Sequence, residues 1–245
     1  MKKTFTIITM LVSLLLAGGN LMAEEALEIM GRIDAKQKAE TSQIRMMMQI
    51  VPAGGSIREY KVESFGRGEK DSFMVFIEPA SIRGLRILEL DNDTRVFFPS
   101  TGRIRRITGD QKSGSAGGIG GDFSYEDMGS GSYSKDYHLS MAGDEGGNWV
   151  IKGVPLDPES SYTQLLFFVD KPKEQVIRTE YYTADEGHKK TLVYKGYRRV
   201  QGIEMPSRLE MTNHTDSQKT VITIEAARYN IQIDEKYFNP NRFYR

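Results

Sequence analysis

Residues Ser72–Phe98 read SFMVFIEPASIRGLRILELDNDTRVFF. The stretch contains three short apolar runs, Ser72–Ile77, Leu85–Leu90 and Arg95–Phe98, which are rich in valine, isoleucine, leucine and phenylalanine. Proline, glycine and polar residues separate the runs at the spacing that is typical of turns. Runs of this length and composition predict β-strands joined by short turns.

The same rhythm continues along most of the chain. Further runs predicted as strands are Ile44–Ile50, Glu59–Phe65, Arg103–Ile107, Trp149–Val154, Leu165–Val169, Val176–Tyr182, Thr191–Tyr197, Ile203–Met211 and Thr220–Ala226. One segment differs, since Glu25–Glu40 has apolar residues at helical spacing and predicts an amphipathic helix. Strands do not alternate with helices, which argues against a nucleotide-binding α/β fold. The predicted fold is mainly β, with an antiparallel sheet that curls.

Two of the runs, Phe73–Ile77 and Leu165–Val169, are apolar at every position. A sheet that faces water on one side would alternate apolar and polar residues, so these strands need cover on both faces. A helix can cover one face, and other strands or a ligand can cover the other. A filled core and an apolar cavity both satisfy this pattern. We predict that the cavity-lining, lipid-binding residues include Phe76, Phe98, Phe167, Leu209 and Met211.

The N-terminus has the order of a secretory signal peptide. Two lysines precede an uncharged, mostly apolar stretch, Thr4–Gly19, and Ala23 precedes an acidic pair. We expect cleavage after Ala23, which makes residues 1–23 a signal peptide, and a retained membrane anchor is the alternative. Because the chain has no cysteine, we expect no lipid modification there. Residues 24–245 are then expected to form a single soluble domain in the periplasm.

The composition excludes several classes of function. Lysine plus arginine and aspartate plus glutamate are equal at 33 each, and this balance argues against nucleic-acid binding. The absence of cysteine excludes disulfides and thiol nucleophiles. The three histidines, His138, His188 and His214, are far apart in the sequence and match no metalloprotease pattern. A hydrolase would need a nucleophile and a base, and no such pair is recognisable. We therefore expect a binding protein with no catalytic residues, no metal and no cofactor.

Gly109–Ser132 is irregular, with eight glycines and five serines in 24 residues. It is too long for a structureless connection in a compact domain. We therefore predict a mobile loop or lid at the mouth of the barrel that the curled sheet would form. The residues predicted to dock or anchor it are Asp122, Phe123, Tyr125, Glu126 and Asp127. The nearest cations in sequence, which are also candidates for headgroup or partner contact, are Arg103, Arg105 and Arg106. The other interpretation is that residues 122–127 only pin a surface loop.

Three segments, Glu78–Leu85, Phe97–Ile107 and Gly120–Asp127, carry a family resemblance. They contain Pro-x-x-x-Arg-Gly, then two aromatic residues before a proline with Arg-Arg-Ile, and then Gly-Asp-Phe-Ser-Tyr-Glu-Asp. This series resembles the outer-membrane lipoprotein-sorting branch of the LolA-like periplasmic carriers, roughly over residues 40–245. The resemblance implies an incomplete, strongly curved antiparallel β-barrel with a few helices plugging the mouth, around an apolar cavity for acyl chains. The extended Gly/Ser insert at Gly114–Gly121 departs from the family pattern.

The resemblance also implies a function. It suggests a periplasmic carrier, expected to be a monomer, that shields the acyl chains of a lipoprotein or a lipid between the inner and outer membranes. The implied partners are an inner-membrane transporter of ABC or RND type as loader and an outer-membrane acceptor. Shielding is needed because each CH2 group exposed to water costs about 0.8 kcal/mol. The alternative is a secreted, outer-membrane-associated β protein that binds other proteins and has no lipid cavity.

Overall fold

The computed structural model describes residues 23–245 with the exception of residues 92, 129 and 130. The predicted signal peptide, apart from Ala23, lies outside the described residues. Residues 23–37 are helical, which confirms the helix predicted over Glu25–Glu40, although the helix ends earlier. Its buried side chains recur at spacings of three and four residues and are Ala26, Ile29, Met30 and Ile33. No helix in the described part of the chain is long and apolar enough to span a membrane.

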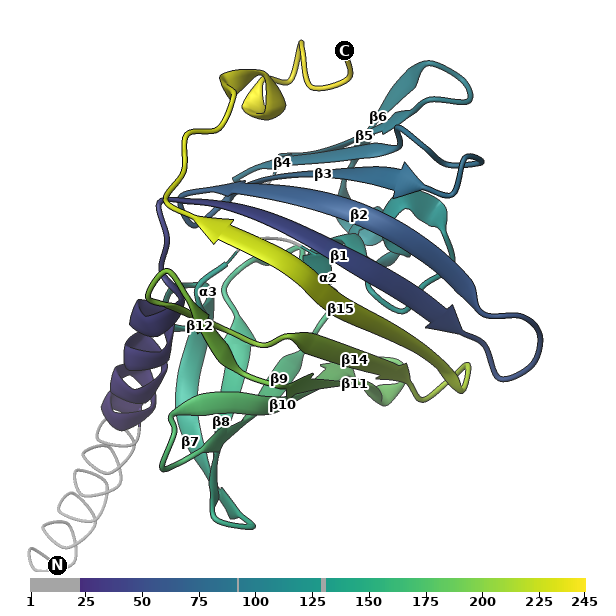
Figure 1. The fold of residues 1–245 in the computed structure, drawn as a ribbon. Helices are drawn as coiled ribbons and strands as arrows, with labels where there is room; N and C mark the ends of the chain where they lie inside the picture. The colour runs from purple at the N-terminus through teal and green to yellow at the C-terminus, as the bar shows by residue number, and fades with distance from the viewer. Residues whose placement is uncertain (1–22, 92, 129–130) are drawn as a thin grey trace, which may run out of the picture.

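Thirteen strands of the described chain form one antiparallel sheet, in the order β6-β5-β4-β3-β2-β1-β15-β14-β11-β10-β9-β8-β7. Their bounds are β1 Thr41–Val51, β2 Arg58–Arg67, β3 Asp71–Glu78, β4 Arg86–Leu90, β5 Asp93–Phe98, β6 Arg103–Ile107, β7 Tyr137–Glu145, β8 Asn148–Pro155, β9 Gln164–Asp170, β10 Gln175–Thr183, β11 Gly187–Lys195, β14 Arg208–Asn213 and β15 Gln218–Tyr229. Figure 1 shows that the sheet is strongly curved and that its edge strands, β6 and β7, do not meet. The incomplete, curved antiparallel barrel predicted from the sequence is therefore confirmed.

The strand predictions differ from the structure in one run that is divided and in two strands that were not predicted, β12 (Arg198–Val200) and β7. The run Ile203–Met211 is divided into β13 (Ile203–Met205), which pairs with β12, and β14. Pro206 lies at the division, where it has no N–H group to donate to a ladder. The edge strand β7 was not predicted. It buries only Leu139 among its nine residues, so its sequence lacks the apolar pattern of a core strand.

Different elements cover the two open ends of the curved sheet. Helix 23–37 lies at one end, where Arg32 donates a hydrogen bond to Glu174 in the turn between β9 and β10. The first part of the connection between β6 and β7 lies at the other end, where Arg58 at the start of β2 donates to the carbonyl groups of Ile119 and Gly120. The last part of this connection returns to helix 23–37, where the N–H groups of Tyr133 and Ser134 donate to Asp34. The short helices in this connection are η1 Gly109–Ser113, η2 Ala116–Gly118, α2 Tyr125–Met128 and α3 Tyr133–Asp136.

The C-terminal segment, residues 231–245, covers the outer face of β2–β5. In its helix η3 (Glu235–Phe238), the ring of Tyr237 stacks on Phe65 and Phe73, with centroid distances of 4.5 and 4.9 Å. Phe238 and Phe243 are buried in the same outer cluster. Figure 1 shows this segment outside the curve of the sheet. It forms a second apolar layer that is separate from the interior cluster.

This outer layer explains part of the two-sided apolarity seen in the sequence. In β3, Phe76 belongs to the interior cluster, whereas Phe73 belongs to the outer cluster. The outer cover of β3 is thus the C-terminal segment and not a regular α-helix. In β9, Phe167 faces the interior, whereas Phe168 lies under the guanidinium group of Arg178, 3.5 Å from the ring centroid. The outer face of β9 is covered by a long side chain of the neighbouring strand.

Candidate functional site

The concave side of the sheet is lined by one apolar cluster, to which strands from β1–β6 and from β7–β15 both contribute. Three of the predicted lining residues, Phe76, Phe167 and Met211, belong to it and are 1% exposed or less. Phe98 and Leu209 are partly buried and pack against it. The structure therefore brings all five residues to one interior surface. Their role in lipid binding stays a prediction.

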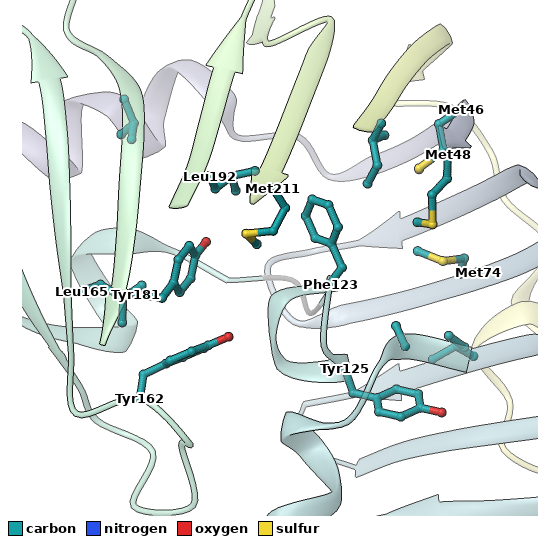
Figure 2. Close-up of a cluster of buried hydrophobic side chains, with 14 of the residues drawn as sticks. Met46, Met48, Met74, Phe123, Tyr125, Tyr162, Leu165, Tyr181, Leu192 and Met211 are labelled. Atoms are coloured by element: carbon teal, nitrogen blue, oxygen red, sulfur yellow. The ribbon is translucent and has the colours of Figure 1, made fainter. Parts of the chain in front are cut away.

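The interior is filled by residues 114–128, which we call the inner segment. Its side chains buried in the interior cluster are Ala116, Ile119, Phe123 and Tyr125. Figure 2 shows Phe123 between Met211 on one side and Met48 on the other. The apolar face of the sheet is thus covered from inside by a segment that is not part of the sheet.

One glycine allows the inner segment to approach the wall this closely. Gly117 has a φ of 69°, a backbone conformation that residues other than glycine rarely adopt. A Cβ atom at this position would lie 2.8 Å from Cδ2 of Leu85, which is closer than real Cβ contacts. The glycine density predicted to make the segment adaptable therefore also serves close packing.

Two carboxylates fix the inner segment to two separate parts of the wall. Asp122 accepts hydrogen bonds from the hydroxyl group of Thr220, at 2.7 Å, and from the amide group of Gln218, at 2.9 Å, both on β15. Glu126 accepts from the connection between β8 and β9, where the Ser161 hydroxyl and N–H groups lie 2.7 and 3.1 Å away. The segment is thus held between β15 and the connection that precedes β9.

A third carboxylate forms a buried ion pair. Asp127 Oδ2 lies 2.9 Å from Nζ of Lys190 on β11, and the two side chains are 1% and 6% exposed. The Tyr162 hydroxyl donates to Asp127 Oδ1 at 2.7 Å, and the N–H group of Ser124 donates to Oδ2 at 2.8 Å. Lys190 also donates to the Tyr162 oxygen, at 3.2 Å. A buried pair needs such additional hydrogen bonds because each ion has lost its water.

Hydroxyl groups extend from this ion pair along the β9–β11 side of the interior. Tyr194 hydrogen-bonds with Thr179, at 3.2 Å, and with Tyr133 and Tyr181. Burial raises the pKa of Tyr133, Tyr162 and Tyr181 well above the ordinary tyrosine value, because the phenolate would be poorly solvated. These groups therefore remain neutral and can donate hydrogen bonds. Figure 2 shows the Tyr162 and Tyr181 hydroxyl groups directed towards the centre of the interior.

The arginines considered as partners of these carboxylates lie elsewhere. Arg103, Arg105 and Arg106 are exposed on the edge strand β6, and Arg106 binds Asp93 at 2.6 Å. The cation that pairs with Asp127 is Lys190 instead, because the curvature of the sheet brings β11 to the inner segment. Contact of the three arginines with a headgroup or a partner protein stays a prediction.

As far as its residues are described, the loop predicted over Gly109–Ser132 contacts the start of β2 at Ile119 and reaches helix 23–37 at Ser132, whose hydroxyl group donates to Asp34. Residues 122–125 are buried, so this block lies inside the curved sheet and not on its surface. The other predicted anchoring residues, Glu126 and Asp127, hold the polar contacts described above. The mobility of this loop stays a prediction.

Two of the histidines, which are far apart in the sequence, come together in the fold. His188 and His214 are neighbours, with ring centroids 4.5 Å apart, because β11 pairs with β14. Both Nε2 atoms lie 2.9 Å from the hydroxyl oxygen of Thr191, on the opposite face of β11 from the interior. Within residues 23–245, leaving aside 92, 129 and 130, no group of three or more metal-ligating side chains could hold a metal ion.

The sequence-based prediction missed the polar part of the interior. Lys190, Leu192 and Tyr194 alternate along β11 and therefore share one face of the strand. The signal available in the sequence was a lysine at a position that alternation assigns to the apolar, buried face of the strand. Tyr162 gave no comparable signal, because it lies in a connection whose position depends on the complete fold.

Comparison with known proteins identifies relatives of this architecture. A family model whose description reads "Uncharacterized protein" matches residues 68–245. No curated protein matches the sequence.

Three solved structures are similar over nearly their whole length. A DUF1329 family protein from Desulfovibrio piger is 22% identical with a TM-score of 0.82, and the match covers 90% of this chain and 98% of that one. A proposed outer membrane lipoprotein-sorting protein domain from Vibrio parahaemolyticus is 25% identical with a TM-score of 0.81, covering 91% and 100%. A LolA superfamily protein from Nitrosomonas europaea is 20% identical with a TM-score of 0.76, covering 88% and 98%.

Proposed function

The chain belongs to the family whose model matches residues 68–245 and has a LolA-like fold, and from these findings we propose that it is a periplasmic carrier of acyl chains. Its cargo is a lipoprotein or a lipid, held on the concave side of the sheet. The observation that carries the proposal is that this apolar surface is covered from inside by the inner segment, which is not part of the sheet. An acyl chain can take the place of that segment without any change in strand pairing.

For an acyl chain taken from water, the energies of apolar burial favour this exchange. An acyl chain with about fifteen CH2 groups gains roughly 12 kcal/mol on leaving water, at about 0.8 kcal/mol per group. The large side chains of the inner segment, Ile119, Phe123 and Tyr125, gain about 1.5–3 kcal/mol each by the same burial. One long acyl chain therefore outweighs the apolar contacts of the inner segment.

A membrane shields acyl chains as well as the protein does, so transfer needs partners at both ends. We propose an inner-membrane transporter of ABC or RND type as the loader and an outer-membrane acceptor as the receiver. Each partner would act by favouring one of two states, with the inner segment in or out of the sheet. The exposed arginines on β6 and the inner segment itself are the candidate contact regions.

One observation favours a second candidate function. The interior surface is buried at Phe76, Phe167 and Met211, which are 1% exposed or less. A secreted, outer-membrane-associated protein that binds other proteins and has no lipid cavity would show the same packing. The carrier and this alternative differ in whether the interior accepts an acyl chain.

Mass spectrometry of an organic extract decides between the two. The protein is purified from periplasm without detergent, and the carrier proposal predicts molecules with acyl chains in an amount comparable with the protein. Met211→Trp fills the interior, whereas Phe73→Trp enlarges an equally buried side chain in the outer cluster. Both changes overpack a core, at a cost of about 1–3 kcal/mol.

The carrier proposal predicts that the lipid content falls in Met211→Trp and is retained in Phe73→Trp. An extract of the unmodified protein without acyl chains would contradict it and support the second candidate. Equal loss of lipid in both variants would show that the interior is not the binding surface.

A further inference from the structure

One corner of the interior presents a group of hydrogen-bond donors, which we call the donor cluster: Ser160, Ser161, Tyr162 and Lys190. The first three lie in the connection between β8 and β9, and Lys190 lies on β11, so all belong to the wall of the sheet. Every one of them donates to a carboxylate of the inner segment. The wall therefore forms an anion site, and two side chains of the inner segment occupy it.

The geometry of this occupation is specific. Glu126 accepts from the Ser160 hydroxyl and from both the N–H and hydroxyl groups of Ser161. Asp127 accepts from the Tyr162 hydroxyl at 2.7 Å and from the Lys190 ammonium group at 2.9 Å. Five donors from the wall thus converge on two neighbouring carboxylates, which are acceptors only.

Departure of the inner segment would change the charge balance of the wall. Lys190 is 6% exposed at its side chain, and the carboxylate paired with it belongs to the departing segment. A buried ammonium group without a counter-ion is strongly unfavourable. A neutral acyl ligand leaves Lys190 in that state, whereas a ligand with its own oxyanion restores the pair and the hydrogen bonds.

We propose that the donor cluster binds the anionic headgroup of the cargo, a carboxylate or phosphate at the end of an acyl chain, and that Glu126 and Asp127 occupy this site in the unloaded protein. This inference rests on the proposed carrier function and specifies its cargo as an anionic amphiphile.

The surroundings of the donor cluster fit such a ligand. The ring of Tyr162 lies 5.0 Å from the ring of Tyr181, which begins the interior wall. Leu192 and Met211 continue that wall towards Phe123 (Figure 2). A headgroup at Lys190 therefore directs its acyl chain into the space that Phe123 fills.

The test compares three probes with the same acyl chain: oleate, dioleoylphosphatidylglycerol and the neutral dioleoylglycerol. Equilibrium binding is measured on the full chain, on Lys190→Met and on the matched control Lys36→Met. Lys36 is also ion-paired, with Glu174 at 3.0 Å, but it lies on helix 23–37 at the other end of the sheet. We expect at least one anionic probe to bind about tenfold or more tightly than the neutral probe. Lys190→Met abolishes this preference, and Lys36→Met keeps it.

The outcomes separate the sources of the anion. Preference for oleate alone assigns a fatty-acid carboxylate, and preference for phosphatidylglycerol alone assigns a phosphate. Neutral dioleoylglycerol that binds as tightly as both anionic probes overturns the headgroup site but leaves the carrier function intact. Failure of the unmodified protein to bind any of the three overturns the carrier function itself.

A second variant keeps the proposal testable if Lys190→Met does not fold. Asp127→Asn retains the shape of the side chain and removes only the charge that competes with the ligand. The proposal predicts tighter binding of the preferred anionic probe, with a smaller change for dioleoylglycerol. Equal changes for both probes, or weaker binding of the anionic one, would overturn it.

Discussion

Two segments that are not part of the curved sheet cover its two faces, and they are attached in different ways. The C-terminal segment lies on the outer face, where Tyr237 stacks on two rings and Phe243 is 2% exposed. The inner segment also buries aromatic side chains, but Asp122 and Asp127 tie it to polar groups on β15 and β11. Figure 1 shows the two segments on opposite sides of the same strands.

The difference indicates which cover can be exchanged. When the C-terminal segment separates from the sheet, its apolar side chains lose their full burial energy, and no polar contact replaces it. The polar contacts of the inner segment end on donors that another anion or water can satisfy. The outer cover therefore belongs to the stable core, and the inner cover is the part that a ligand can displace.

The largest effect is expected when one buried phenylalanine in each cover is replaced by alanine. Phe243→Ala and Phe123→Ala each remove a buried ring and should lower the free energy of unfolding by about 3–5 kcal/mol. Their effects on oleate binding should differ. Phe123→Ala removes a side chain that competes with the acyl chain and should tighten binding, whereas Phe243→Ala should leave binding unchanged.

Urea denaturation and oleate titration measure these two quantities on the same protein preparations. Ile57→Ala is the control, because Ile57 is 55% exposed and its loss should change the stability by less than about 0.5 kcal/mol. Tighter binding in Phe243→Ala, or weaker binding in Phe123→Ala, would contradict the division into a fixed and an exchangeable cover.

Much of the sheet could be predicted because its strands have a local signature. The run that contains Phe73 and Phe76 identifies β3 and also shows that both faces must be covered. The nature of the outer cover could not be predicted in the same way. Residues 231–245 have neither strand nor helix periodicity, and their aromatic side chains gain a role only when the chain returns to β2–β5.

The candidate site was predicted in part for a related reason. The glycine-rich segment and the block Asp122–Asp127 are recognisable in the sequence, and they form much of the inner segment. Their partners are not recognisable, because Lys190 is 63 residues from Asp127. Proximity in sequence favoured Arg103, Arg105 and Arg106, whereas the curvature of the sheet selects Lys190. Such pairings depend on tertiary structure and not on local propensity.

A reversible cross-link tests whether the inner cover must move. A Cβ atom added at Gly121 would lie 3.4 Å from the hydroxyl oxygen of Thr220, close to the position of a cysteine sulfur. The double variant Gly121→Cys and Thr220→Cys should therefore form a disulfide, the only one in a chain without cysteine. Closing this long loop should raise the free energy of unfolding by about 2–4 kcal/mol.

The oxidised double variant should bind oleate more weakly than the same protein after reduction. The reduced form is the matched control, because it carries both substitutions and differs only in the cross-link. Mass measurement confirms which form is present. Equal binding by the two forms would show that ligands enter without displacement of the inner segment.

The outer face of β14 is not covered by the C-terminal segment, and the smallest effect is expected there. On the outer face of β14, Glu210 accepts hydrogen bonds from Lys219 at 2.6 Å and from Arg208 at 2.7 Å. Lys195 lies 3.0 Å from the same carboxylate. The hydrogen bonds from Lys219 and Arg208 lower the pKa of Glu210 from 4.5 to about 2.

The lowered pKa predicts a pH-dependent contribution to stability. The folded state binds the proton of Glu210 less readily than the unfolded state, so the contribution is complete above about pH 4.5 and is lost as the pH falls towards 2. Because the cationic partners are largely exposed, Glu210→Gln should cost only about 1 kcal/mol at pH 7. Urea denaturation at several pH values should show the difference between the two proteins disappearing near pH 2, and added salt should reduce it at pH 7. A loss as large as that of Phe243→Ala would instead place this uncovered face in the stable core, and the contrast between covered and uncovered regions would fail.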